Sequence, residues 1–368
     1  MKYKEAILFI GKCLTLSVYP DKIAEIREEI RTGLVEWERV VWVSTGQFVF
    51  PAFYLQLQKA GLLAELPEDL VEYMEEITEL NRQRNREIIE QAKEITVLLN
   101  SHAITPVFLK GTANLLDDLY EDIAERMVGD IDLLVDETMM IKTAEILIGS
   151  GYKQMEEISP DVLKVARHYP RLVHENRIAA IEVHRQILQN PECKMLDARV
   201  IIKESKKLSV PGAANVLNNR HQIIYNILNA QINDQASYFR KFYFRQNYDL
   251  FLLAQRENPQ TVAEDFEDFF GMLNANLAVT NLLLDNPDCI PFKPARKAIR
   301  FRNRIIFYIE HPKWAHFTQI NLYILQRFRN MARDLFQAIY SKKSRRSLYS
   351  RFTDRKWYIN HLKAFSKV

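Results

Sequence analysis

The spacing of apolar residues changes twice along this chain, and those changes limit the folds that it can form. Residues 1 to 85 follow the helical period of 3.6, as in "ELPEDLVEYMEEITEL" (65–80). Between 86 and 210, short apolar runs typical of buried strands alternate with helical stretches, and from 211 to 368 the helical period returns. The sequence therefore predicts an α+β fold, in which a small mixed sheet lies between N-terminal and C-terminal helical regions.

Glycine and cysteine usage agree with this interpretation. The 368 residues include only 10 glycines, which favours helices over tight hairpins. The three cysteines, Cys13, Cys193 and Cys289, are far apart and form no CxxC pair, so we expect free thiols. Free thiols are typical of the reducing cytoplasm, where we place the protein. The apolar run 40–57 contains Ser, Thr, Gly, Gln and Pro, so it predicts a buried helix pair and no membrane span.

Two carboxylates lie within the strand-like run "VGDIDLLVD" (128–136). Asp is unfavourable in strands, and a buried carboxylate without a partner is costly. Alternate strand side chains point to the same side, so Asp130 and Asp132 face one way, with Cα atoms roughly 6.6 Å apart. Because such carboxylates repel each other, we expect a divalent cation, and oxygen ligands suit Mg²⁺ or Mn²⁺.

The run "IAAIEVH" (178–184) repeats this pattern. Glu182 lies in an apolar, strand-like segment, and His184 follows two residues later on the same face. If the two strands are adjacent, Glu182 adds a third carboxylate to the metal site. We interpret His184 as a supporting residue and not as a ligand.

A candidate phosphate site precedes these strands. The segment "FLKGT" (108–112) predicts a strand that ends at Gly111 and a helix that opens at Thr112, a favourable N-cap residue. Glycine allows the backbone to approach a ligand closely, and free N–H groups at the start of a helix bind phosphates.

Charge is distributed unevenly. Residues 291–368 contain 19 Lys/Arg and 3 Asp/Glu, a net charge of +16, so residues 1–290 carry −13. This division is compatible with a basic helical region packed on an acidic one, or with a surface for a polyanionic partner such as RNA.

Taken together, these motifs resemble the nucleotidyltransferase superfamily of DNA polymerase beta. Its signature is a strand, a Gly-Ser or similar pair opening a helix, a strand with Asp-x-Asp, and a later strand with a third acid. More narrowly, "ITPVFLKGTANLL…R…GDIDLLV…AEILIGSGY…IEVHRQI" resembles a bacterial family of uncharacterised nucleotidyltransferases, from about Trp37 to Leu253. Thr112 replaces the usual Ser, and the gap between Gly111 and Asp130 is longer than in the simplest members.

The resemblance implies a fold and an activity. Residues 86–210 would form the nucleotidyltransferase core, flanked by helical regions 1–85 and 211–368. The activity would be Mg²⁺-dependent transfer of a nucleoside monophosphate from a triphosphate such as ATP to a hydroxyl acceptor, with release of pyrophosphate. The acceptor is left open between RNA, a protein and a small molecule.

The resemblance also implies residue roles. Asp130 and Asp132 would hold the metal ions, and Glu182 would bind the ion nearer the acceptor. Three residues of the first strand and helix and one later arginine would bind the nucleotide phosphates: Lys110, Gly111, Thr112 and Arg126.

Other interpretations of individual side chains remain open at this point. Lys110 could be a solvated strand end, and Arg126 could pair within its own acidic loop. Arg245 and Asp249, four residues apart on a helix, predict a local ion pair. The adjacent acids 117 and 118 predict a solvated helix face.

Two other function classes are compatible with the sequence. One is a catalytically silent member of the fold that binds a nucleotide and acts as a regulator. The other is a nucleic-acid-binding module that uses the basic C-terminus.

Overall fold

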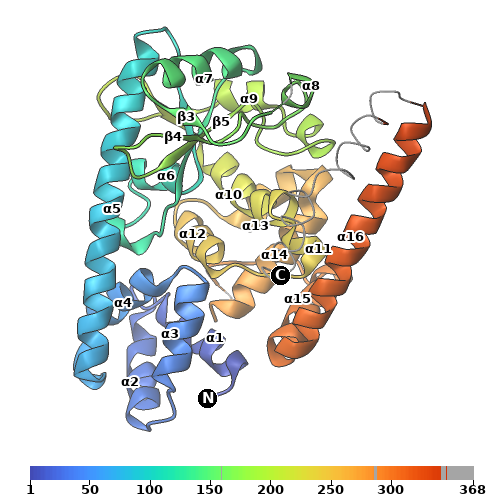
Figure 1. The fold of residues 1–368 in the computed structure, drawn as a ribbon. Helices are drawn as coiled ribbons and strands as arrows, with labels where there is room; N and C mark the ends of the chain where they lie inside the picture. The colour runs from blue at the N-terminus through green and yellow to red at the C-terminus, as the bar shows by residue number, and fades with distance from the viewer. Residues whose placement is uncertain (159, 286–287, 341–344, 346–368) are drawn as a thin grey trace. The chain divides into compact units, whose positions relative to one another are not determined.

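A computed structural model describes residues 1–158, 160–285, 288–340 and 345 (Figure 1). Of the basic segment 291–368, for which the sequence analysis leaves a polyanionic partner open, residues 341–344 and 346–368 lie outside the described residues.

Five helices form the N-terminal part: α1 Tyr3–Cys13, α2 Ile23–Arg31, α3 Trp37–Gly46, α4 Phe50–Lys59 and α5 Glu68–Asn100. The apolar run 40–57 falls in α3 and α4, which confirms the predicted helix pair. Among the described residues, no helix is both long enough and apolar enough to cross a bilayer. All three cysteines are free thiols, as predicted.

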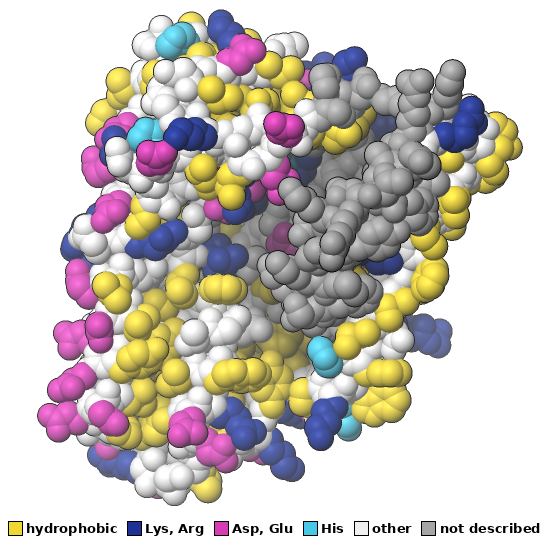
Figure 2. Space-filling view, viewed as in Figure 1, with side chains coloured by type: hydrophobic (Ala, Val, Ile, Leu, Met, Phe, Trp, Pro, Cys, Tyr) yellow, Lys and Arg dark blue, Asp and Glu magenta, His cyan; other side chains and the backbone are white. Residues whose placement is uncertain are grey.

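Helix α5 connects the N-terminal helices to the sheet (Figure 1). It is continuous over 33 residues, so residue 85, the predicted end of the first region, lies inside it. Exposed acidic side chains follow its outer side, and Figure 2 shows them along that edge of the view. Its buried polar side chains bind the core: Gln91 Nε2 donates to the Ala179 carbonyl over 2.9 Å.

Seven short strands form one mixed sheet in the order β3-β4-β5-β2-β1-β7-β6. Their bounds are β1 Val107–Leu109, β2 Asp130–Leu134, β3 Lys153–Gln154, β4 Leu172–Val173, β5 Ala180–His184, β6 Lys206–Lys207 and β7 Asn215–Val216. Strand β2 pairs antiparallel with β1 and parallel with β5. The mixed sheet among many helices confirms the predicted α+β class.

Further helices cover this sheet or follow it in the chain. They are α6 Lys110–Leu116, α7 Met140–Gly149, α8 Pro160–Leu163, α9 Ala198–Lys203, α10 Asn219–Leu228, α11 Ala236–Phe239, α12 Phe244–Ala254, α13 Pro259–Asp265, α14 Phe270–Leu283, α15 Arg296–Glu310 and α16 Pro312–Tyr340. The helical period predicted after residue 211 is therefore present.

The chain divides into two compact units. The larger contains residues 1–234 and 243–302, including the whole sheet, and the smaller contains residues 235–242 and those from 303 onward. Within the smaller unit, α11 packs on α16, and the Tyr238 hydroxyl donates to the Leu322 carbonyl over 3.1 Å. The sequence-based boundaries at 85 and 210 stay predictions.

Helix α1 approaches the end of α14 so closely that only glycine fits at the contact. A Cβ atom on Gly11 would lie 1.7 Å from the Leu283 carbonyl oxygen. We therefore expect Gly11→Ala to lower the free energy of unfolding by about 3 kcal/mol, measured by urea denaturation, because the backbone of one helix must move.

Gly271, within α14, provides the matched control, because a Cβ atom there meets nothing within 4 Å. Gly271→Ala should leave the free energy of unfolding unchanged or raise it by up to about 1 kcal/mol. Equal effects of the two substitutions would contradict the packing seen at Gly11.

Candidate functional site

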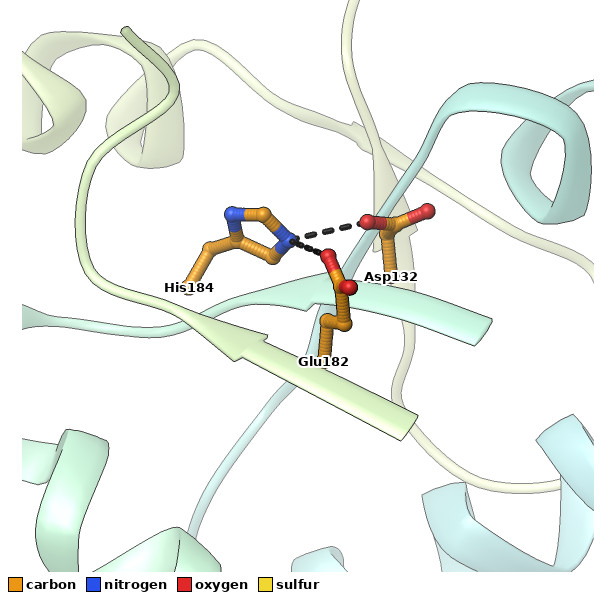
Figure 3. Close-up of side chains that lie close together, drawn as sticks. All are labelled: Asp132, Glu182 and His184. Carbon is orange, nitrogen blue, oxygen red and sulfur yellow. Dashed lines mark hydrogen bonds and ion pairs between the residues drawn. The ribbon is translucent and has the colours of Figure 1, made fainter. Parts of the chain in front are cut away.

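The register between β2 and β5 brings the predicted acids together. Asp132 lies opposite Glu182, and Leu134 lies opposite His184. Since the strands are parallel and in register, alternate side chains of both point to the same face. One ligand atom from each of Asp132, Glu182 and His184 lies within 4.8 Å of the others, as Figure 3 shows.

Asp132 is 5% exposed, and two cationic or polar groups neutralise it. Lys110 Nζ lies 2.6 Å from Asp132 Oδ1, and His184 Nε2 lies 2.9 Å from the same oxygen. Burial works to raise the pKa of Asp132, but Lys110 and the His184 hydrogen bond outweigh it, so the pKa is lowered. The carboxylate therefore stays ionised inside the protein.

Arg171 connects the other two carboxylates. Its Nη2 lies 2.7 Å from Asp130 Oδ2 and 3.2 Å from Glu182 Oε1. Burial raises the pKa of Asp130 despite Arg171. For Glu182, burial is outweighed by the hydrogen bond and charge of His184, and the pKa falls well below its usual range.

The turn between β1 and α6 has a strained backbone at the site. Lys110 adopts φ +52°, a left-handed conformation that residues with a side chain rarely adopt. A Cβ atom on the next residue, Gly111, would lie 2.9 Å from a methyl group of Val128. This turn directs the Lys110 ammonium to Asp132, and strain of this kind is common at functional sites.

Thr112 lies apart from these polar groups. Helix α6 begins at Lys110 and follows Leu109 as the N-cap, so Thr112 is inside the helix and the predicted N-cap is wrong. Its side chain is 1% exposed, and its hydroxyl donates to the Asp130 carbonyl over 3.0 Å. In this position Thr112 fixes the start of β2 against α6.

Arg126 forms an ion pair with a residue that is distant in the sequence, and not with an acid of its own loop. Its Nη2 lies 2.9 Å from Asp249 Oδ2, and Asp249 also accepts a hydrogen bond from the Tyr120 hydroxyl over 2.7 Å. The predicted local pair between Arg245 and Asp249 is therefore replaced by a buried pair with Arg126. Arg245 instead donates to the Met127 carbonyl over 3.2 Å.

Asp117 also differs from its predicted solvated position. It is buried, and its carboxylate lies 2.6 Å from both Lys206 Nζ and Arg256 Nη1. Asp118 is exposed, as predicted.

A polar cavity of about 210 Å³ borders the acid cluster. Its wall includes both β2 carboxylates, Asp130 and Asp132, but Glu182 does not line it. The β1–α6 turn, the loop before β2, and helices α10 and α12 supply further lining residues, among them Lys110, Gly111, Arg126, Tyr225 and Arg245. Five of the seven predicted site residues thus line the cavity: Asp130, Asp132, Lys110, Gly111 and Arg126.

The donor atoms fit a divalent cation. Asp130, Asp132 and Glu182 supply carboxylate oxygens on one face of two paired strands, the ligand type that Mg²⁺ and Mn²⁺ prefer. His184 lies between Asp132 and Glu182, at 2.9 and 3.4 Å from their oxygens, where it holds both carboxylates in place. This cluster could bind a metal ion.

Sequence reasoning missed Arg171 and Arg245 as parts of the site. Arg171 directly precedes β4, whose Leu172 pairs with Ile181 of β5, so the neighbouring Arg171 reaches Glu182. The segment "RLVHEN" (171–176) is also strand-like, and pairing it antiparallel with "IAAIEVH" (178–184) identifies Arg171 as a neighbour of Glu182. No local signal identifies Arg245, because the groups around it come from distant segments.

The fold and the site define an α+β protein with three strand carboxylates beside a polar cavity. A family model described as uncharacterised nucleotidyltransferase matches residues 34–284, more than half of the chain, and the protein belongs to this family. Membership supports a transferase activity on a nucleotide substrate. Neither the curated proteins nor the solved structures contain a match.

The buried Arg126–Asp249 pair should contribute strongly to stability. Asp249 is 2% exposed, so Asp249→Asn leaves a buried guanidinium without its counter-charge. We expect the free energy of unfolding to fall by about 3 kcal/mol, measured by urea denaturation. Asp265→Asn, which breaks the exposed pair with Arg220, is the control and should cost less than about 1 kcal/mol. Similar losses in both variants would contradict the burial of the pair.

Acid should destabilise the protein partly through Glu182. Because its pKa is lowered on folding, the unfolded chain takes up the proton first as pH falls, and the stability that Glu182 contributes above about pH 4.5 is lost. Glu182→Gln should therefore flatten the fall of the urea midpoint between about pH 5 and pH 3, measured in EDTA.

Asp130→Asn serves as the comparison, because the pKa of Asp130 is raised and its contribution has the opposite sign. In this variant, the decrease of the urea midpoint between about pH 5 and pH 3 should be unchanged or steeper. A flatter curve for Asp130→Asn, or an unchanged one for Glu182→Gln, would contradict these assignments.

Proposed function

We propose that the protein transfers a nucleoside monophosphate from a nucleoside triphosphate to a hydroxyl group of an acceptor, with Mg²⁺ or Mn²⁺ as the metal. One observation carries the proposal: the β2–β5 register joins Asp130, Asp132 and Glu182 on one face, beside a polar cavity. The likeness to the DNA polymerase beta superfamily, and ATP as the triphosphate, belong to the same proposal.

The reaction balances as an in-line displacement. The acceptor oxygen forms a bond to the α-phosphorus, the bond from that phosphorus to the β-bridging oxygen breaks, and the hydroxyl proton and pyrophosphate are released. A divalent cation, when bound, supplies positive charge for the attacking and leaving oxygens.

The residues of the site would serve two sides, one for the cation and triphosphate and one for the acceptor. Asp130 and Asp132 line the cavity and would hold the cation there, with the triphosphate among Lys110, Gly111 and Arg126. Glu182, outside the cavity and beside Arg171, would serve the acceptor side. Thr112 would act through its hydrogen bond to the Asp130 carbonyl, which fixes the strand that carries both carboxylates.

The acceptor is proposed only as a hydroxyl compound: an RNA end, a protein side chain or a small molecule, encountered in a bacterial cytoplasm. The most direct search incubates the protein with each α-labelled nucleoside triphosphate, Mg²⁺ and cell extract, and identifies the labelled product. Acceptors of these three kinds separate by nuclease, protease and filtration.

Two substitutions test the roles of the acids. Asp132→Asn should remove transfer and make triphosphate affinity equal in Mg²⁺ and in EDTA, measured by calorimetry, because the cation loses a buried ligand. Glu182→Gln should leave triphosphate affinity within about threefold and slow transfer by at least a hundredfold.

The variants must keep the wild-type fold, verified by circular dichroism. Triphosphate binding that is equally tight in Mg²⁺ and EDTA in the wild type would refute a metal-dependent site. Wild-type binding without any labelled product would favour the silent, regulatory class.

A further inference from the structure

Arg245 lies on the cavity wall without a carboxylate partner at ion-pair distance among the described residues. Its guanidinium contacts the ring of Phe48, 5.0 Å from the centroid, and donates one hydrogen bond, to the Met127 carbonyl. Its Nε is buried and has no hydrogen-bond partner. The side chain as a whole is half-buried, but a buried donor that is left unused is costly unless an acceptor such as an anion enters the site.

The environment of Arg245 adds to the free-energy cost of its positive charge. Burial and the neighbouring Arg126 lower the pKa of Arg245 to about 10, so both act against its positive charge. Asp249, whose charge acts in the opposite direction, is already bonded to Arg126 and Tyr120. Asp234 also lines the cavity, accepts a hydrogen bond from Asn229 over 3.2 Å, and has a pKa raised by burial.

A second unused donor lines the same cavity. Tyr225, on α10, is 3% exposed, and its buried hydroxyl has no hydrogen-bond partner. Gln222 Oε1, an acceptor, also lacks a partner there. The two unused donors, one of them on the Arg245 cation, match a ligand with several anionic oxygens better than they match an aromatic base, since Tyr225 is the one aromatic side chain among the described residues that line the cavity.

Arg126 differs from Arg245 although both line this wall. Its Nε and Nη2 bond to Asp249, and its Nη1 donates to the Met127 carbonyl over 3.0 Å. Because the Arg126 guanidinium is used within the protein, it is a positioning residue for the loop that precedes β2.

We propose that Arg245 and Tyr225 form an oligophosphate site that binds the terminal phosphates of the nucleoside triphosphate, the part released as pyrophosphate. The proposal rests on the proposed function for the identity of the ligand. It transfers the role of phosphate ligand from Arg126 to Arg245, and Lys110 and Gly111 line the same cavity.

Inorganic pyrophosphate is the probe, because it binds without any transfer reaction. Calorimetry would compare the wild type with Arg245→Gln, Arg245→Lys and Tyr225→Phe, using pyrophosphate, a nucleoside triphosphate and the matching monophosphate. We expect Arg245→Gln to weaken pyrophosphate and triphosphate binding roughly ten- to hundredfold, and Tyr225→Phe roughly three- to tenfold. Arg245→Lys should lie between Arg245→Gln and the wild type, and monophosphate affinity should change less than threefold.

Stability supplies an independent readout. Since Arg245 is a half-buried charge without a bonded acid among the described residues, Arg245→Gln should keep or raise the melting temperature of the free protein, whereas a structural arginine would lower it. Arg220→Gln is the matched control, because Arg220 lies on α10 in a partly exposed pair with Glu257 and Asp265 and does not line the cavity. It should leave all three affinities unchanged.

The outcomes separate this inference from the proposed function. Pyrophosphate binding that depends on Arg245, in a protein that labels no acceptor, supports the site and contradicts the transferase. Transfer activity with unaltered pyrophosphate affinity in Arg245→Gln overturns the site alone. The site is also overturned if wild-type protein does not bind pyrophosphate, or if monophosphate and pyrophosphate affinities fall equally.

Discussion

The burial of one ionised carboxylate, Asp132, governs the arrangement of the central strands. A carboxylate inside a strand is stable only if cations and donors replace the water that it loses. Lys110 supplies the cation from the end of β1, and His184 supplies a ring nitrogen from β5. Three neighbouring strands must therefore stay in register, and the left-handed turn at Lys110 is the local strain that this arrangement requires.

The parts of the fold that depend on short-range pattern could be predicted from the sequence. The period of two in "DIDLLV" and "IEVH" places Asp130, Asp132 and Glu182 on one face once the strands pair, and the α+β class follows from the change of period. The predicted N-cap, Thr112, lies three residues after the observed N-cap, Leu109, because Lys110 adopts a backbone conformation for which its residue type gives no signal.

The partners of the charged side chains could not be predicted, because they are set by tertiary contacts. Asp249 lies four residues from Arg245, yet it bonds to Arg126, 123 positions away in the chain. Asp117 is buried for the same reason, since Arg256 reaches it from 139 positions away. A helical spacing of four identifies possible ion pairs, but burial and a better-aligned donor decide which pair forms.

Helix α5 has a consequence for how this chain tolerates length changes. Asn81 and Asn85 bind carbonyls of the loop that carries Arg126, and Gln91 binds the Ala179 carbonyl next to β5, all from one side of an uninterrupted helix. One inserted residue between Asn85 and Gln91 would rotate the two halves by about 100° relative to each other. The helix thus fixes both the rotation and the distance between the loop that carries Arg126 and the strand that carries Glu182, and an insertion of any length in this segment would break one of the two sets of contacts.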